Sequence, residues 1–147
     1  MKIEEVLERE GMYVATIEGV SMYPMLRMRR DTVVIKKYEG RLRKFDVPLY
    51  KVGDRYILHR IIKVLPDSYV IRGDNLEKKE YGNSEENILG VLTAFYRDEK
   101  EIDMNGFAYK AYVYIWHYTF YIRAFVKKVY RKLRPRRIVD TGNDMVG

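Results

Sequence analysis

The stretch YILHRIIKVLPDSYVIR, residues 56–72, decides the fold. It is rich in Val, Ile and Tyr, and the turn signal Pro66–Asp67 divides it into two short apolar segments, as in an antiparallel hairpin. Because side chains alternate between the two faces of a strand, Ile57, His59 and Ile61 share one face. The stretch therefore predicts a β-hairpin that carries a histidine among aliphatic side chains.

Similar segments occur on both sides of this hairpin. Short runs rich in Val, Ile, Thr and Tyr, separated by Gly, Pro, Asp and Asn, occupy residues 12–17, 32–37 and 89–96. Ahead of them, Ile3–Glu10 has apolar residues at helical spacing and is followed by Gly11, a helix stop signal. The pattern predicts a mainly β fold, an antiparallel β domain with a short N-terminal helix.

The composition excludes several classes of protein. The chain has 147 residues, 47% of them hydrophobic, which is enough for one domain with a buried core. It contains no cysteine, which excludes a disulfide scaffold and any zinc site built from cysteines. The two histidines, His59 and His117, are not accompanied by acidic residues at the spacing of metal ligands. We therefore expect no metal site.

The net charge of +7 comes from the end of the chain. Residues 1–106 carry 19 basic and 19 acidic groups, whereas residues 107–147 carry 9 basic groups and two acidic ones, Asp140 and Asp144. The polar stretch 99–106 separates the two parts. We expect a charge-balanced β domain over residues 1–106 and a basic tail over residues 107–147.

The tail is also aromatic, and its first residues predict a helix from Phe107 to Lys132 with Pro135 as a stop signal. Three arrangements fit this helix: a membrane span over residues 107–126, a helix in the lipid headgroup region, and an amphipathic helix packed on the β domain. We favour contact with an anionic membrane surface, on a side that the sequence leaves open. Aromatic residues surround the helix, and basic residues follow them: Lys127, Lys128, Arg131, Lys132, Arg134, Arg136 and Arg137.

The N-terminus offers no alternative anchor. Its first residues are charged, without the order of a secretory signal, and no run there approaches the roughly 20 apolar residues that span a bilayer. We therefore expect any membrane attachment to lie in the tail.

Three short boxes in the predicted β domain contain residues suited to hydrolysis. They are Gly-Val-Ser-Met-Tyr-Pro-Met at 19–25, Leu-His-Arg-Ile at 58–61 and Arg-Gly-Asp-Asn at 72–75. In this order they resemble the type I signal peptidase family, in particular the archaeal and endoplasmic-reticulum-type Ser-His branch of the signal peptidase and self-cleaving repressor superfamily. The resemblance covers about residues 13–95 and leaves out the tail. It implies a signal-peptidase-like antiparallel β domain.

The residue types themselves suit nucleophilic catalysis. A serine hydroxyl attacks when a base within about 2.6 to 3.2 Å takes its proton, and a neutral imidazole fits that role. Burial among aliphatic groups favours the neutral form of an imidazole. We predict Ser21 as the nucleophile and His59 as the general base. Taken alone, each also fits a structural role, as a capping serine and a core histidine.

A third role, that of an acid beside the histidine, depends on strand register. If Pro66–Asp67 is the centre of a symmetric turn, His59 lies opposite Asp74, whose carboxylate would orient the imidazole. Pro-Asp suits a type I turn, so a bulge would shift this register, and Gly-Asp-Asn is also an ordinary turn signature. In some family members the acid lies further along this box, where the chain offers Glu77 and Glu80. We predict Asp74, with these two residues as alternatives.

The resemblance also implies a substrate groove next to the nucleophile. Met22, Tyr23 and Pro24 are the expected substrate-binding residues, although hydrophobic residues around Ser21 fit the domain core equally well. Gly19 stands where many bacterial members have a second serine. Backbone N–H groups, including that of Ser21, would then stabilise the oxyanion.

The expected function is that of a membrane-associated serine endopeptidase of the signal peptidase I type. The resemblance implies a secretory precursor or leader-bearing peptide as substrate, bound as an added strand, and no cofactor. Family members usually have an N-terminal membrane helix, and the residues before Ser21 contain no suitable one. A second hypothesis is therefore an enzyme that is not bound to a membrane and cleaves a different substrate, such as the leader of a secreted peptide. A catalytically inactive binding module, docking on an anionic membrane or a partner protein, is the alternative. No nucleic-acid partner is expected, because residues 111–122 carry no charges between their aromatic side chains.

Overall fold

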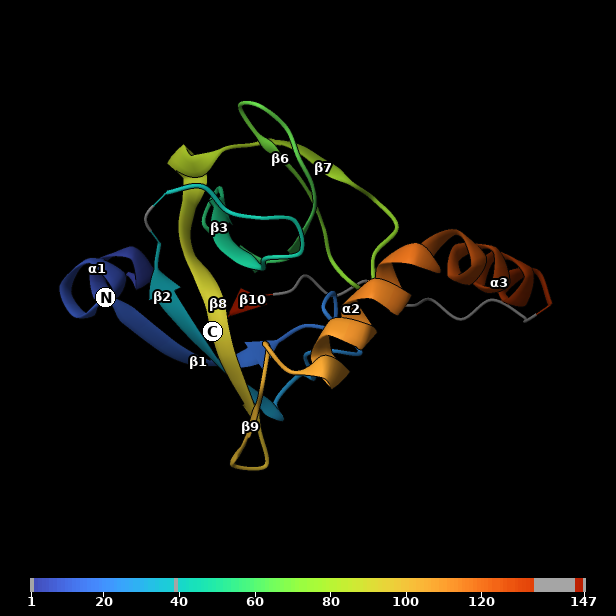
Figure 1. Ribbon diagram of the computed structural model, residues 1–147, viewed down its shortest axis with the longest axis horizontal. Coiled ribbons are helices and arrows are strands. Elements are labelled where there is room, and N and C mark those ends of the chain that lie inside the picture. The colour runs from blue at the N-terminus through green and yellow to red at the C-terminus, as the bar shows by residue number, and fades with distance from the viewer. Residues whose placement is uncertain (1, 39, 134–144, 147) are drawn as a thin grey trace.

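The computed structural model describes residues 2–38, 40–133 and 145–146 (Figure 1). Its helices are α1 (Ile3–Glu10), α2 (Phe107–Tyr118) and α3 (Phe120–Leu133), with a 3-10 turn at Glu85–Asn87. Its strands are β1 (Met12–Glu18), β2 (Asp31–Lys37), β3 (Pro48–Val52), β4 (Arg55–Leu58), β5 (Arg60–Val64), β6 (Tyr69–Arg72), β7 (Glu80–Asn83), β8 (Ile88–Arg97), β9 (Lys100–Ile102) and β10 (Met145–Val146). The fold is mainly β, which confirms the predicted fold class.

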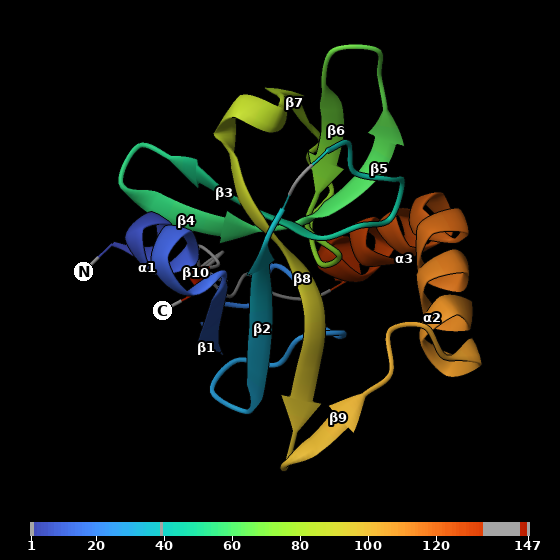
Figure 2. The same ribbon diagram turned by 60° about the vertical axis from the view of Figure 1, so that its left-hand side comes forward.

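Two antiparallel sheets make up the β domain. In the larger sheet the neighbours follow the order β10-β1-β2-β8-β3-β4, and β9 pairs with β8. Strands β5, β6 and β7 form the smaller sheet. In both views α1 lies on one side of the strands and the α2–α3 pair on the other (Figures 1 and 2). The smaller sheet and the C-terminal helices therefore occupy the same side of the molecule.

The β domain buries two apolar clusters. The larger sheet and α1 enclose one cluster, which includes Leu7, Val33 and Leu58. The smaller cluster includes Ile57 and Ile71. Ile57 and Leu58 are neighbours on β4 but belong to different clusters. Strand β4 therefore runs along the boundary between the two clusters.

Most predicted elements are found close to their expected positions. Helix α1 has the predicted bounds, and Gly11 ends it with a left-handed φ of 73°. Strands β1, β2, β6 and β8 cover the predicted segments. The sequence gives weak signals for β3 and β7, because β3 begins with Pro48 and β7 contains Gly82, residue types that usually mark turns.

The first half of the stretch at residues 56–72 forms two strands rather than one. Strand β4 ends at Leu58 and β5 begins at Arg60, so His59 lies where the chain passes from the larger sheet to the smaller one. Ile57 and Ile61 both belong to the smaller cluster, as their shared face predicts. The histidine is thus buried at the junction of the two sheets.

The start of the tail forms two helices, which corrects the prediction of a single helix. At Thr119 the backbone leaves helical geometry, with φ −96° and ψ 8°, and the hydroxyl donates to the carbonyl of Ile115. Back-bonding of this kind bends helices. The predicted stop signal Pro135 and the basic residues Arg134, Arg136 and Arg137 lie outside the described residues.

The bend falls inside residues 107–126, the range of the predicted membrane-spanning alternative. Across the described parts of the chain, no helix is both long enough and apolar enough to cross a bilayer.

Helix α2 packs on the β domain through one face. Tyr109 and Tyr112 lie against the larger apolar cluster, and Val113 is buried. Helix α3 has no buried residue within its bounds and extends away from the sheets (Figure 1). The two halves of the predicted helix therefore have different surroundings: α2 is packed, and α3 exposes most of its surface.

Candidate active site

Ser21 and His59 meet at the boundary between the two apolar clusters. The Ser21 Oγ lies 2.6 Å from the His59 Nε2, within hydrogen-bond distance. Both residues are buried, with 2% of Ser21 and 4% of His59 exposed. The structure thus brings together the predicted nucleophile and the predicted base, which are 38 residues apart in the chain.

Ser21 is held in a tight turn that follows β1. Gly19 has a φ of 86°, a conformation that glycine adopts without strain, and the Tyr23 N–H donates to the Val20 carbonyl at 3.1 Å. Asn75 fixes the turn from outside, because its N–H donates to the Ser21 carbonyl at 2.7 Å and its side chain donates to the Val20 carbonyl. The first and third boxes of the sequence are therefore bonded to each other through their backbones.

Gly73 allows the three boxes to meet. A Cβ atom at this position would lie 2.7 Å from the Ser21 carbonyl oxygen and 3.2 Å from the His59 Cδ2. The first distance is shorter than atoms tolerate without displacement of the backbone. The glycine of the Gly-Asp-Asn box is thus required by the close approach of the nucleophile turn and the histidine.

On the other side of the imidazole, His59 faces Tyr50 and Glu80. The His59 Nδ1 lies 3.2 Å from the Tyr50 hydroxyl and 3.4 Å from the Glu80 Oε1. The same hydroxyl donates to the second carboxylate oxygen of Glu80. A carboxylate at Nδ1 favours the tautomer that leaves Nε2 free to accept the serine proton. Ser21, His59 and Glu80 therefore lie in the order that a nucleophile, a base and an acid take in a catalytic triad.

The environment keeps Glu80 ionised. Burial by itself would raise the pKa of its carboxyl group, but hydrogen bonds from His59 and Tyr50 outweigh burial. The net effect lowers the pKa of Glu80 below its ordinary value of 4.5. At neutral pH this group is an anion, which can stabilise an imidazolium formed on its neighbour.

The predicted contact between Asp74 and His59 is wrong. The hairpin pairs Lys63 with Val70, as the symmetric turn predicts, but the register then shifts by one residue, so that Ile61 pairs with Ile71. A bulge of this kind turns the following side chains to the other face of the strand. Glu80, one of the two predicted alternatives, reaches the imidazole instead. The other alternative, Glu77, lies 3.8 Å from Arg131.

Asp74 belongs to a second buried cluster. The Arg60 guanidinium donates to both of its carboxylate oxygens, at 2.9 and 3.0 Å, and the Tyr112 hydroxyl donates to one of them at 2.8 Å. Burial by itself would lower the pKa of Arg60, but the charge of Asp74 outweighs burial and raises it. Burial and the same carboxylate raise the pKa of Tyr112. These groups join α2 to the loop after β6.

Two of the predicted substrate-binding residues are accessible. Met22 is buried in the larger apolar cluster, together with Met25 and Leu26, so the core alternative holds for these residues. Tyr23 is 49% exposed and Pro24 is partly buried. A substrate that approaches Ser21 would therefore meet the outer side of the turn.

Two pockets in the described part of the chain lie away from Ser21. One of about 610 Å³ lies between the loop at residues 42–46 and α2, and another of about 490 Å³ lies between the smaller sheet and the joint of α2 with α3. Among described residues, neither lining includes Ser21 or His59. Over the same part of the chain, no group of three or more His, Cys, Asp or Glu side chains is arranged to hold a metal ion.

Sequence reasoning missed Tyr50 as a member of the site. It is one of 14 tyrosines in the chain and lies on β3, a strand without a clear signal. Its role depends on the pairing of β3 with β4, which brings Tyr50 opposite Ile57. Comparison of the chain with protein-family models, with curated proteins and with solved structures finds no match.

Proposed function

We propose that the protein is a serine endopeptidase of the signal peptidase type. The observation that carries the proposal is the distance of 2.6 Å between the Ser21 Oγ and the His59 Nε2. The His59 Nδ1 faces a carboxylate, as the base of a serine protease requires. The resemblance of the three boxes to the signal peptidase family supports the same class of enzyme.

The proposed reaction is acyl transfer through the serine. The Ser21 Oγ attacks the carbonyl carbon of the scissile bond while its proton passes to the His59 Nε2. The imidazolium then protonates the leaving amine, and the peptide acyl group stays on the serine. In the second half, His59 takes a proton from water, which attacks the ester, and returns this proton to the Ser21 Oγ as the bond to the acyl group breaks and the acid is released. Glu80 stabilises the imidazolium in both halves.

The family resemblance supplies the substrate class. We propose an extended segment of a secretory precursor or leader-bearing peptide, with small residues before the cleavage point, added as a strand beside the active-site sheet. The mechanism uses groups of the chain and a water molecule, and it calls for no metal or organic cofactor.

Leader-peptide cleavage tests the assignment. Ser21→Ala and His59→Ala are expected to reduce cleavage to background, because each removes a group that reacts directly. Ser68→Ala is a matched control, since Ser68 lies in the β5–β6 turn. Cleavage at the wild-type rate by both Ser21→Ala and His59→Ala would refute the proposal.

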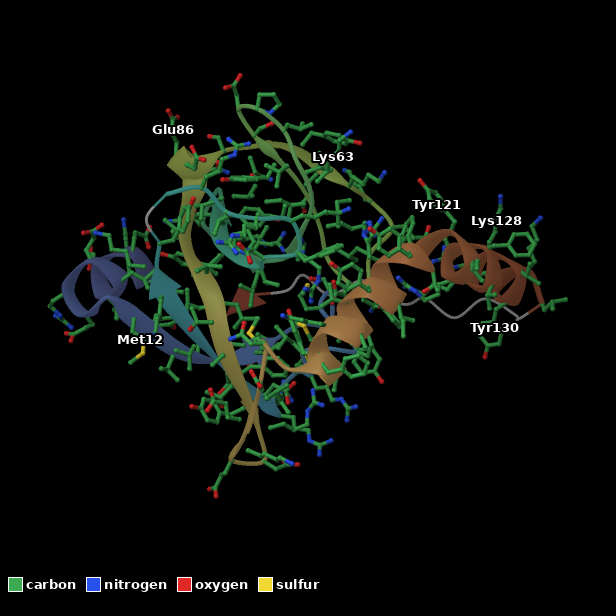
Figure 3. The ribbon with its side chains drawn as sticks, viewed as in Figure 1. Met12, Lys63, Glu86, Tyr121, Lys128 and Tyr130 are labelled. Carbon is green, nitrogen blue, oxygen red and sulfur yellow. The ribbon has the colours of Figure 1, made fainter. Side chains whose placement is uncertain are left out.

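We propose further that the enzyme associates with an anionic membrane surface through α3. Five exposed apolar residues follow helical spacing along this helix: Ile122, Phe125, Val126, Val129 and Leu133. Figure 3 shows Tyr121, Lys128 and Tyr130 projecting from the same helix. Residues 107–133 contain no acidic side chain. Apolar and basic groups on one exposed helix suit the headgroup region of an anionic bilayer.

Vesicle sedimentation tests this location. The double variant Phe125→Asn/Val129→Asn is expected to lose binding to phosphatidylglycerol vesicles, because it removes two apolar groups from the exposed stripe. Val52→Asn is the control, since it removes a similarly exposed aliphatic side chain from β3. Equal binding by both variants would contradict a role for α3.

The burial of Ser21 favours a second candidate function. With 2% of this residue exposed, the fold also suits a catalytically inactive binding module that docks on a membrane or a partner protein. A serine-directed acylating probe separates the two functions. Labelling of the folded wild type at Ser21, absent in Ser21→Ala, supports the enzyme, whereas no labelling of the wild type supports the module.

A further inference from the structure

A basic pocket lies outside the proposed active site, between the smaller sheet and the joint of α2 with α3. Its volume is about 490 Å³. Four basic or titratable nitrogen side chains line it: Lys63, Arg72, Lys79 and His117. Among the described residues its lining contains no aspartate and no glutamate. The pocket therefore concentrates positive charge without an acidic residue to balance it.

Arg72 is the central group of this pocket. It is 6% exposed, and its guanidinium lies over the Phe120 ring, 3.6 Å from the ring centre. Within the described part of the chain no carboxylate pairs with it; Asp74, the nearby acid, is bonded to Arg60 and Tyr112. A guanidinium stacked on a ring keeps the N–H groups at its edge available for an anion.

The electrostatics of the surrounding groups agree with this picture. Burial and repulsion from Arg123 lower the pKa of Arg72. Burial lowers the pKa of His117, and the charges of Lys44, Arg72 and Lys79 lower it further. Burial is the largest cause in both groups, neighbouring cations add to it, and the charge of Asp74 partly opposes it at Arg72; a bound anion would oppose both shifts.

His117 adds a second, independent observation. Its Nδ1 is buried and has no hydrogen-bond partner within the described residues. A buried polar atom without a partner costs free energy, and an anionic oxygen would supply the missing acceptor. The aromatic residues Tyr118, Phe120 and Tyr121 form the remaining wall beside it.

We propose that this pocket binds a phosphate group. Phosphate oxygens accept hydrogen bonds from the edge of a guanidinium in the geometry that arginine offers, and lysines add charge. The group belongs either to a small soluble phosphate ester or to the headgroup of an anionic lipid. The site is separate from Ser21 and His59, so phosphate binding does not depend on the proposed peptidase activity.

The imidazole of His117 provides a local measurement on the full chain. The protein has two histidines, so the ring signals of His117 in nuclear magnetic resonance spectra are assigned by comparison with His59→Gln. Titration with inorganic phosphate is expected to move the His117 signals in a saturable way, while chloride at equal ionic strength does not. Vesicles of phosphatidylglycerol, compared with phosphatidylcholine, form the second arm. Saturation by inorganic phosphate supports a soluble ligand, and a response only to phosphatidylglycerol supports a lipid headgroup.

Variants connect the signal to the pocket. Arg72→Gln is expected to raise the dissociation constant about tenfold, because it removes charge-assisted hydrogen bonds to the anion. Lys63→Gln/Lys79→Gln, which leaves the buried guanidinium in place, is expected to weaken binding several-fold and covers the case that Arg72→Gln does not fold. Lys36→Gln is the control, because Lys36 is exposed on β2 and does not line the pocket. No response of His117 to either ligand, or equal affinity in the pocket variants and the control, would overturn the proposal.

Discussion

His59 and Arg60 are neighbours in the chain, and each contacts one carboxylate and one tyrosine hydroxyl. His59 faces Glu80 and Tyr50, whereas Arg60 donates hydrogen bonds to Asp74 and to the Tyr109 hydroxyl. The clusters differ in burial: the Glu80 side chain is 31% exposed and the Asp74 side chain 4%. They differ also in geometry, since the arginine pair is joined by two short hydrogen bonds and the imidazole lies 3.4 Å from its carboxylate.

This difference separates two roles that look alike in the sequence. A fully buried bidentate ion pair is fixed and saturated, and it joins β5, the loop after β6, and α2. A half-buried carboxylate beside an imidazole leaves room for the histidine to gain and lose a proton. We therefore assign Asp74 to the stability of the fold and Glu80 to the proposed reaction.

The largest expected effect is on stability, in Asp74→Asn. Removing one charge of a buried pair leaves Arg60 uncompensated, which costs about 3 to 5 kcal/mol of unfolding free energy. Urea unfolding measures this loss. The control is Arg60→Met/Asp74→Leu, which removes both charges and is expected to regain most of the stability. A fully stable Asp74→Asn variant that no longer cleaves would reverse the roles assigned to the two acids.

A smaller effect is expected on the reaction, in Glu80→Gln. The amide keeps the size of the side chain but removes the charge that stabilises the imidazolium, so we expect kcat on a leader peptide to fall about 100-fold, or about 2.7 kcal/mol of barrier. The unfolding free energy should change by about 1 kcal/mol or less, because Glu80 is partly exposed. Full activity in this variant would show that the imidazole works without the carboxylate.

The sequence predicts much of the fold and two members of the candidate site. Alternation and turn residues predict α1 and the longer strands, and the three boxes predict that Ser21 and His59 act together. The choice between Asp74 and Glu80 depends on the bulge between Ile61 and Lys63, which shifts the pairing of β5 with β6 by one residue. Local sequence does not encode such a shift, because it depends on the packing of distant strands.

Neither the bend between α2 and α3 nor the basic pocket could be predicted from the sequence, for a similar reason. A run without Gly or Pro predicts one helix over residues 107–132, while the bend at Thr119 lets α2 pack on the β domain and brings Phe120 over Arg72. The guanidinium then lies in a pocket made by segments far apart in the chain. Only the folded arrangement reveals that no carboxylate among the described residues pairs with it.

The smallest expected effect concerns Glu4, which has the same kinds of partner as Asp74 but lies near the surface. Its carboxylate accepts hydrogen bonds from Tyr56 and Lys51, and these lower the pKa of Glu4 from 4.5 to about 2, with the tyrosine contributing most. A lowered pKa stabilises the fold above pH 4.5, and this contribution disappears as the pH falls towards 2. We therefore expect wild type to be more stable than Glu4→Gln by about 1 kcal/mol at pH 6, since solvent screens a partly exposed pair. Thermal unfolding from pH 6 to pH 2 measures the difference, which should shrink below pH 4.5. A difference that persists at pH 2 would mean that packing of the side chain, and not its charge, stabilises α1, and the contrast between buried and exposed carboxylates would then rest on Asp74 alone.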